Sequence, residues 1–495
     1  MKVMVLGLDG ATFDLIIPWI NEGKLPTLAK LMKEGAVADL KSTYPPLTPP
    51  SWTSMITGKK PSRHGLYDFV GLDKEFKQKL FLSHDRFGDD IFDLLSNEGL
   101  KSVALNIPFT FPPSEIHGVK VSGMLTPNSD VDFIQPASLK EDFLKRFPDY
   151  KFELDWSEYK GRRDDFFKDT FKLMDDRFAM ITHFKESVEW DLFFAVITDT
   201  DRAQHFTWNN DDLFSVYARV DEKIGKLIKK LPKDTHLFIV SDHGAAEVKK
   251  IFNANCFLRE KGYLVEKKKR KAISFARKII GERGFKVVAK LYKKMKFGSS
   301  TNKKFESSLI NYATEIDMKK TKALALGFGV VYVNEQLEFD KKEFIAALKN
   351  DLLNFEDSGK KVIETVVTDE DYLQSDVEHF GPKLAFVPVN GYGRDCSLGK
   401  KAIISEDSEG AGTHAMNGIF IAHGLKVKKG KLKKTLHVED LGPTILGLLG
   451  VPIPTFLDGA CLKSLFKANT MDIKAAEESS KEERLIKDAL KDVSL

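Results

Sequence analysis

Residues 1–10 read Met-Lys-Val-Met-Val-Leu-Gly-Leu-Asp-Gly, an apolar run that stops abruptly at Asp9 and a glycine. An apolar run of this length that ends in a turn signal is typical of a strand buried on both faces. Helical patterns separate this run from later ones, and such alternation predicts a mostly parallel sheet with helices on both sides. We therefore expect an α/β protein with a three-layer α/β/α sandwich. The further strand-like runs lie at 102–107, 191–198, 236–241 and 418–422.

The helical patterns and weaker strand patterns suggest how the chain is organised. We expect a discontinuous core formed by 1–250 and 405–466, with 251–404 inserted as an α+β cap. Residues 467–495 form a C-terminal tail that includes an amphipathic helix at 480–493. In the cap we expect strands at 324–333 and 384–388. Apolar residues at helical spacing predict helices at 26–34, 90–98, 164–185, 214–230, 341–353 and 437–449.

The charge of the chain is unevenly distributed. The 495 residues are 42% hydrophobic and 30% charged, with a net charge of +4, which is a globular composition. Residues 267–304 hold 15 Lys and Arg but one acid, together with apolar residues at helical spacing. This segment is either the solvated face of the cap or a basic amphipathic stretch that contacts an anionic membrane. We expect no nucleic-acid partner, because aromatic residues do not interleave with the charges as single-strand binding requires.

The cysteines and the hydropathy pattern exclude several classes of protein. Cys256, Cys396 and Cys461 are far apart and form no CxxC pair, which argues against a disulfide framework and a cysteine zinc site. We find no signal-peptide pattern at the N-terminus and no apolar segment long enough to span a bilayer. We therefore expect a cytoplasmic protein whose candidate contact with a membrane is the basic segment 267–304.

Aspartates and histidines follow three of the predicted strands. Ligands in open α/β sheets bind outside the carboxyl ends of the strands, so these side chains should face one side of the sheet. Carboxylate and imidazole together suit Zn²⁺, Mn²⁺ or Fe better than Ca²⁺. Six ligands fit two metal ions better than one tetrahedral ion. Two metal ions about 4 Å apart are typical of enzymes that catalyse displacement at phosphorus. The residues are Asp9, Asp201, His205, Asp242, His243 and, just before the strand at 418–422, His414.

Each of these signals has an ordinary explanation when it is taken alone. An Asp-Gly pair after a strand, as at Asp9, is most often a turn. A single His beside an apolar residue, such as His205, is more often a structural residue than a ligand. The segment Asp242-His243-Gly244 would also serve as a turn that ends a strand. The metal-site hypothesis therefore rests on the joint order of the motifs along the chain.

In that order the sequence resembles the alkaline phosphatase superfamily, and most closely its type I phosphodiesterase/nucleotide pyrophosphatase branch. The resemblance implies an alkaline-phosphatase-like sandwich and a metal-dependent hydrolase of phosphoric esters. It covers the chain from residue 9 to residue 414, and later segments at 438–445 and 457–459 look like the C-terminal part of the family. The matching motifs are Gly7-Leu-Asp-Gly10, Pro45-Pro-Leu-Thr-Pro-Pro-Ser-Trp52, Thr57-Gly58, Pro61-Ser-Arg-His-Gly65, Asp201-Arg-Ala-Gln-His205, Ser241-Asp-His-Gly244 and Gly412-Thr-His414.

The resemblance makes Thr48 the nucleophile. The residues themselves agree, because Thr48 lies in a proline-rich loop that would hold its hydroxyl in place. A Thr hydroxyl needs a metal ion or a base to become nucleophilic near neutral pH. The expected chemistry is two in-line displacements through a phosphothreonine, with retention of configuration at phosphorus. Ser51 and Trp52 are the predicted substrate-binding residues, and packing in the core is the alternative for Trp52.

The resemblance also implies two divalent ions, most simply Zn²⁺, with Mn²⁺ or Fe as alternatives. The two predicted ligand sets are Asp9, Thr48, Asp242 and His243 for one ion, and Asp201, His205 and His414 for the other.

Several functions share this metal core. The leading hypothesis is cleavage of phosphodiester or pyrophosphate bonds in a small phosphate ester or a lipid-linked substrate. A phosphomonoesterase, a phosphotransferase like phosphoglycerate mutase, and a non-catalytic phosphate- or lipid-binding protein stay open. A sulfatase is disfavoured, because that family needs Cys or Ser where Thr48 stands.

Overall fold

The computed structural model describes residues 1–154, 156–159, 161–267, 310–369, 372, 380–406 and 411–468. Of the basic segment 267–304, only Lys267 lies within these ranges, and the tail helix at 480–493 lies outside them. In the part of the chain that is described, no helix is long and apolar enough to cross a membrane.

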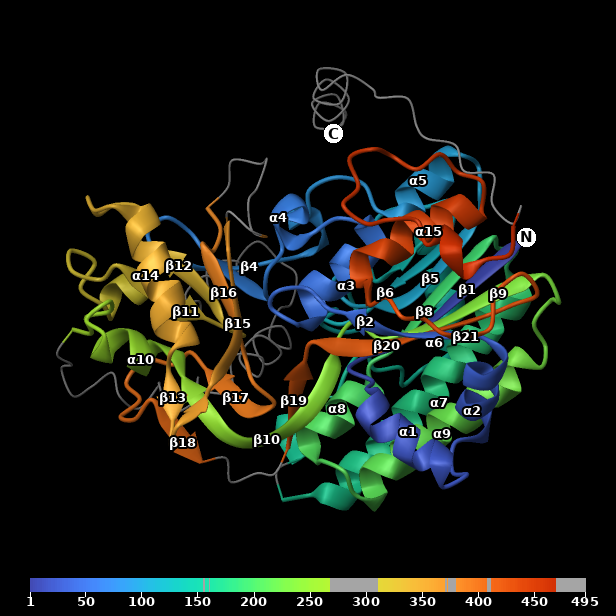
Figure 1. The fold of residues 1–495 in the computed structure, drawn as a ribbon. Coiled ribbons are helices and arrows are strands. Elements are labelled where there is room, and N and C mark those ends of the chain that lie inside the picture. The colour runs from blue at the N-terminus through green and yellow to red at the C-terminus, as the bar shows by residue number, and fades with distance from the viewer. Residues whose placement is uncertain are drawn as a thin grey trace.

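A ten-stranded, mostly parallel sheet forms the centre of the core (Figure 1). β1 pairs in parallel with β8 and β9, and β5 pairs in parallel with β8 and β6. β20 returns antiparallel between β9 and β2. The order is β21-β2-β20-β9-β1-β8-β5-β6-β7, with β22 beside β2. The strands are β1 (Lys2–Leu8), β2 (Ala36–Lys41), β5 (Ser102–Ile107), β6 (Gly118–Ser122), β7 (Ile134–Gln135), β8 (Leu192–Ile197), β9 (Thr235–Val240), β20 (Asn417–His423), β21 (Gly430–Lys431) and β22 (Leu436–His437).

Helices cover both faces of this sheet, which confirms the predicted three-layer sandwich (Figure 1). Successive residues of β1 pack on opposite faces: Met4 and Leu6 join one hydrophobic cluster, while Val3 and Val5 join the other. The first face carries α1 (Phe13–Asn21), α2 (Pro26–Glu34), α7 (Arg163–Ser187), α8 (Asp199–Phe206) and α9 (Asp211–Ile228). The second carries α3 (Thr48–Thr57), α5 (Ile91–Asn97) and α15 (Leu441–Leu448).

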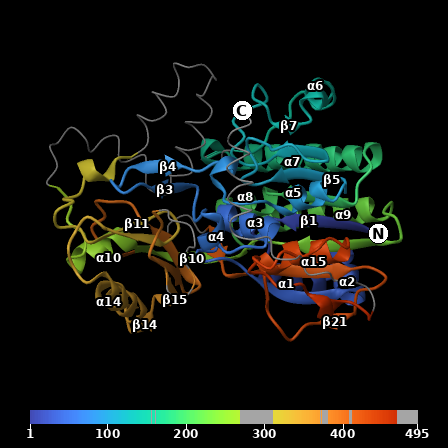
Figure 2. The ribbon, with the colours of Figure 1, turned by 90° about the horizontal axis from the view of Figure 1, so that it is seen from above.

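The long strand β10 (Gly244–Asn253) runs from the core into a second body, the cap, which lies beside the core (Figures 1 and 2). β10 pairs with β17 (Gly391–Asp395), β18 (Ile404–Glu406) and β19 (Gly412–Ala415). The cap has its own hydrophobic cluster, to which Tyr67, Leu72 and Phe76 from the N-terminal part of the chain also contribute. Its other elements include α10 (Ala254–Glu260), α14 (Lys341–Leu353), the two-stranded β13 (Glu356–Asp357) and β14 (Lys360–Lys361), and the sheet of β11 (Ala323–Leu326), β12 (Val330–Val333), β16 (Leu384–Pro388) and β15 (Ile363–Thr368).

One cap prediction is wrong. The run at 324–333 was expected to be a single strand, but it forms the antiparallel hairpin β11–β12. Gly327 and Gly329 turn the chain with φ angles of +50° and +100°, which a glycine adopts without strain. The residues of both strands are buried and apolar, so the hydropathy stays high along the whole run. The hydropathy therefore does not show that a turn divides the run into two strands. The hairpin places Phe328 at its tip.

Candidate active site

The first predicted ligand set meets at the carboxyl ends of β1 and β9. Asp9 directly follows β1, and Asp242 and His243 lie between β9 and β10. His243 Nε2 lies 3.6 Å from Asp9 Oδ1 and 3.3 Å from Asp242 Oδ2. One ligand atom of each of the three residues lies within 4.8 Å of the other two, and all three residues are buried. The structure therefore brings these residues together as predicted from the order of the motifs.

The second predicted set lies next to the first. Asp201 and His205 occupy successive turns of α8, and His414 reaches them from β19. His205 Nε2 is 2.8 Å from His414 Nε2, and Asp201 Oδ1 is 3.3 Å and 3.4 Å from these two nitrogens. His243 belongs to both groups, because its ligand atom is also within 4.8 Å of Asp201 and His414.

All three histidines of the site present the same ring nitrogen. In each ring Nδ1 lies against a backbone carbonyl, so Nδ1 carries the proton and Nε2 faces the site as an acceptor. Two unprotonated nitrogens as close as those of His205 and His414 require a proton or a cation between them. The Nδ1 atoms of His205, His243 and His414 lie 3.1, 2.9 and 3.1 Å from the carbonyl oxygens of Gly412, Gly244 and Pro46.

The electrostatics of the site also favour cations. Burial, together with the negative charges of neighbouring carboxylates, raises the pKa of Asp9 and of Asp242 well above the ordinary range. Burial would raise the pKa of Asp201, but His205 and His414 in their protonated forms hold this pKa well below its ordinary range. Burial lowers the pKa of His414 to about 4, so this ring is neutral at pH 7.

Two buried oxygens, Asp9 Oδ1 and Asp242 Oδ2, have no hydrogen-bond partner among the described residues. Crowded carboxylates with unpartnered oxygens and neutral imidazoles form a donor set that fits divalent metal ions.

Thr48 lies at the edge of this cluster. It is the first residue of α3, followed by Pro49 and Pro50, and only 2% of its surface is exposed. Its Oγ1 is 3.3 Å from His243 Nε2. Thr48 thus stands at the N-terminus of a helix, the end that carries partial positive charge.

The two predicted substrate-binding residues, Ser51 and Trp52, are fully buried. The Ser51 hydroxyl is 2.7 Å and 2.8 Å from the hydroxyls of Ser42 and Thr43. Trp52 Nε1–H donates to Asp9 Oδ2 at 3.0 Å. Their contacts are thus with protein groups, and for Trp52 the contact holds a predicted metal ligand. A role in binding substrate stays a prediction for both residues.

Sequence reasoning did not single out the residues behind the ligands. Arg202 donates to Asp201 Oδ2 at 3.3 Å and to Glu153 Oε2 at 3.1 Å. Phe328 of the cap stacks on His414 with ring centroids 4.9 Å apart. Arg202 lies inside the Asp201–His205 motif, which was a usable signal. Glu153 and Phe328 are distant in sequence and carry no such signal.

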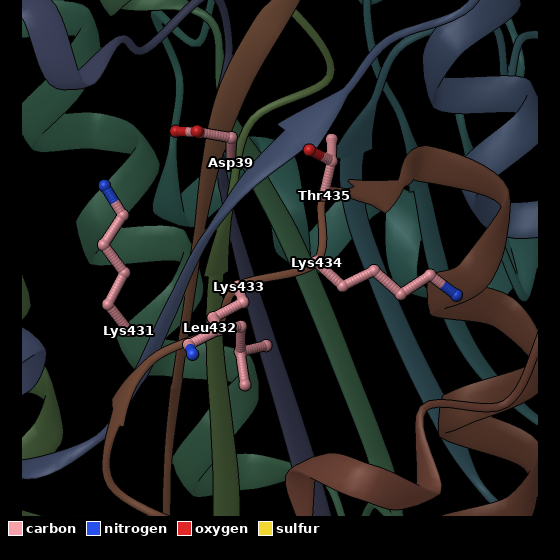
Figure 3. Close-up of a pocket in the computed structure, with 6 residues that line it drawn as sticks. All are labelled: Asp39, Lys431, Leu432, Lys433, Lys434 and Thr435. Carbon is pink, nitrogen blue, oxygen red and sulfur yellow. The ribbon is translucent and has the colours of Figure 1, made fainter.

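Figure 3 shows a pocket that is lined by Asp39 and residues 431–435. It is at the β21 edge of the sheet, where Asp39 of β2 faces the segment 431–435. None of the predicted site residues lines it. The candidate active site is therefore the Asp and His cluster, and this pocket is separate from it.

The chain belongs to the type I phosphodiesterase/nucleotide pyrophosphatase family, whose model matches residues 3–372. This confirms the predicted family, and the protein is accordingly a hydrolase that acts on phosphoric esters. A comparison with curated proteins gives no significant match.

Solved structures with the same fold lie within the alkaline phosphatase superfamily. Murine ectonucleotide pyrophosphatase/phosphodiesterase 5 is 16% identical to this chain and superposes with a TM-score of 0.54. The match covers 94% of this chain and 100% of the murine chain. Phosphonoacetate hydrolase from Sinorhizobium meliloti is 15% identical, with 89% and 94% of the two chains covered and a TM-score of 0.56. Alkaline phosphatase PafA is 14% identical, with 94% and 99% covered and a TM-score of 0.56.

Proposed function

We propose that the protein is a two-metal phosphohydrolase that cleaves phosphodiester or pyrophosphate bonds with Thr48 as its nucleophile. The observation that carries the proposal is the position of Thr48 Oγ1, 3.3 Å from His243 Nε2 at the edge of the Asp and His cluster. The murine relative offers a parallel, since its structure with AMP is of an inactive threonine-to-alanine variant.

In this proposal Asp9, Thr48, Asp242 and His243 would hold one ion, and Asp201, His205 and His414 would hold the other. Zn²⁺ suits this mixture of carboxylate and imidazole, and Mn²⁺ or Fe are the alternatives. When bound, the two ions lower the pKa of the attacking oxygen and neutralise charge that develops during displacement at phosphorus.

The protein groups act on the reaction in a defined order. The Thr48 hydroxyl gives up its proton and its oxygen attacks phosphorus in line with the departing oxygen. The P–O bond to that oxygen breaks, and the leaving group takes up a proton and departs as an alcohol or, from a pyrophosphate, as a phosphate. The resulting phosphothreonine is hydrolysed by water from the opposite side, which restores the Thr48 hydroxyl. Because each displacement inverts phosphorus, the two together retain its configuration. The N-terminus of α3 stabilises negative charge on the Thr48 oxygen in both steps.

The charge of the site and the ligands of its structural relatives support a proposal for the substrate class. Three buried carboxylates and two divalent ions leave a net positive site, which suits an anionic phosphate ester. The murine relative binds AMP, and the Sinorhizobium enzyme binds phosphonoformate and phosphonoacetate. We propose a small phosphate ester, with a lipid-linked ester as the alternative.

The first test compares a generic aryl phosphodiester with the matching aryl phosphomonoester, each in Zn²⁺ and in Mn²⁺. We expect metal-dependent cleavage of the diester, and a loss of at least about 10³-fold in kcat for Thr48→Ala. Thr48→Ser keeps a hydroxyl and should retain measurable activity. Preference for the monoester would change the proposed substrate class to phosphomonoesters but would be consistent with the same mechanism. Full activity in Thr48→Ala would refute the proposed nucleophile.

We further propose a cytoplasmic location with the basic segment 267–304 in contact with an anionic membrane. The support is the concentration of 15 Lys and Arg in that segment. Flotation with vesicles of phosphatidylserine and phosphatidylcholine tests the contact. Binding that rises with the phosphatidylserine fraction and falls with salt is expected, and equal recovery with neutral vesicles would refute it.

A further inference from the structure

His414 is the one histidine of the site on which a side chain of the cap hairpin stacks. Its ring is stacked by His243, with centroids 3.8 Å apart and planes 21° apart. It is also stacked by Phe328, with centroids 4.9 Å apart and planes 11° apart. Phe328 comes from the tip of the β11–β12 hairpin, so the cap and the metal-site cluster meet at this ring.

The hairpin tip is itself held from two directions. Asp68, a buried residue that follows α4 (Pro61–His64), accepts a hydrogen bond from Phe328 N at 3.1 Å. Arg394 of β17 donates from Nη1 to Phe328 O at 3.1 Å and from Nη2 to His414 O at 3.3 Å. Both backbone polar groups of Phe328 are therefore bonded to side chains, and one of these side chains also binds the backbone of His414.

This arrangement is costly for the residues that make it. The Nε of Arg394 is buried and has no hydrogen-bond partner within the described part of the chain. Burial lowers the pKa of the Arg394 guanidinium to about 10 and raises the pKa of the Asp68 carboxyl to about 6. Buried polar groups without full partners cost free energy, so simple packing of an apolar hairpin tip does not account for Arg394 and Asp68.

The stacked ring of Phe328 restricts the orientation of the His414 ring in a way that the carbonyl of Pro46 cannot. The bond from Nδ1 of His414 to Pro46 O fixes which nitrogen carries the proton, but a single hydrogen bond permits the ring to tilt about it. A second flat ring held against the imidazole restricts that tilt. Groups behind metal ligands orient them in this way, and their loss typically weakens metal binding about 10- to 100-fold.

We propose that Phe328, clamped by Asp68 and Arg394, is a positioning residue through which the cap holds His414 as a metal ligand. The inference rests on the proposed two-metal site. It makes the cap a structural part of the site formed by Asp201, His205 and His414. Loosening the hairpin tip should therefore weaken the binding of one metal ion and leave the binding of the other unchanged.

The test is calorimetric titration of metal-stripped protein with Zn²⁺, a readout that does not depend on turnover. The wild type should bind two ions, and His205→Ala identifies which binding step belongs to the set of Asp201, His205 and His414. Phe328→Ala should weaken that step about 10- to 100-fold and leave the other step within about twofold. Phe328→Tyr keeps the flat ring and should restore affinity to within about threefold of the wild type.

Two further variants separate this role from stability. Phe355 packs on Phe252 and Phe257 inside the cap, with centroids 5.6 Å and 5.3 Å away, so Phe355→Ala loosens the cap away from the site. It should leave both Zn²⁺ steps unchanged. Arg394→Met keeps most of the side-chain volume but removes both bonds to carbonyls, and it should weaken the same step as Phe328→Ala.

The outcomes are distinguishable. Wild-type affinity for both ions in folded Phe328→Ala protein, or equal weakening in Phe355→Ala, would overturn the positioning role and leave the two-metal site standing. A wild type that binds fewer than two Zn²⁺ ions in the cluster would overturn the proposed function, and the positioning role with it.

Discussion

Replacing Asp242 with Asn should stabilise the metal-free protein at neutral pH, although it removes a metal ligand. The ligand oxygens of Asp9 and Asp242 lie within 4.8 Å of each other in a fully buried site. Two unit charges at that distance repel by about 3.5 kcal/mol at an effective dielectric constant of about 20. Asn keeps the oxygen that accepts from Gly10 N at 3.2 Å, so the local backbone geometry is preserved. The free energy of unfolding should rise by up to about 3 kcal/mol.

The effect should depend on pH in a definite direction. The pKa values of Asp9 and Asp242 are raised in the folded protein above the unfolded value of about 3.9. Stability from these two groups is therefore fully present below about pH 4 and is lost as pH rises through the folded pKa values. Asn does not titrate, so the advantage of Asp242→Asn should grow from pH 4 to pH 8.

The assay is urea unfolding in EDTA at several pH values, repeated in excess Zn²⁺. In Zn²⁺ the order should reverse, because the wild type gains binding free energy that the variant loses. Asp221→Asn is the matched control: this buried carboxylate accepts from Thr27 N and Leu28 N at 3.0 Å and 2.7 Å, and it belongs to neither of the two candidate metal-ligand groups found among the described residues. It should destabilise the protein in EDTA. The reasoning would be refuted if Asp242→Asn were no more stable than the wild type at pH 8. It would also be refuted if the difference in stability were the same at all pH values.

Three further predictions concern the same site. Trp52→Phe removes the donor to Asp9 Oδ2 and should weaken Zn²⁺ binding about tenfold, and unchanged calorimetric affinity would contradict this. In Gly7→Ala the new Cβ would lie 2.2 Å from a Trp52 ring carbon, so urea unfolding should show a loss of about 1–3 kcal/mol. The double variant should lose less than the sum of the two, because Phe lacks that atom, and strict additivity would argue against the clash. Removal of metal with EDTA should lower the melting temperature, and Zn²⁺ at about 100 times its Kd should restore about 2.7 kcal/mol per site.

Local patterns predicted most of the core. The apolar run that stops at Asp9 is the strand β1 (Lys2–Leu8), 102–107 is a strand with the predicted bounds, and 26–34 and 341–353 are helices with the predicted bounds. These elements are buried on one stripe or on both faces, so their hydropathy period reports their environment directly. The hairpin around Phe328 was missed because both of its strands are buried and the turn between them is short.

The candidate ligands could be predicted from the sequence because each stands in or next to an element whose end the sequence marks. Asp9 follows β1, Asp201 and His205 share one face of α8, and the sheet topology then brings these strand ends to one edge. Contacts between segments far apart in the chain have no such local marker. Glu153 behind Arg202, and Phe328 stacked on His414, depend on how a loop of the core and a hairpin of the cap pack.

Hydropathy and motif order thus specified the layers, the family and the residues that face the proposed metals, because burial and strand ends leave periodic and local signals. Three contacts were decided only by tertiary packing. They are the position of His243 in both ligand groups, the hydrogen bond of Trp52 to Asp9, and the stacking of Phe328 of the cap on His414. These depend on distances between side chains that are tens to hundreds of residues apart, and such distances are set when the sheet, α3 and the cap assemble.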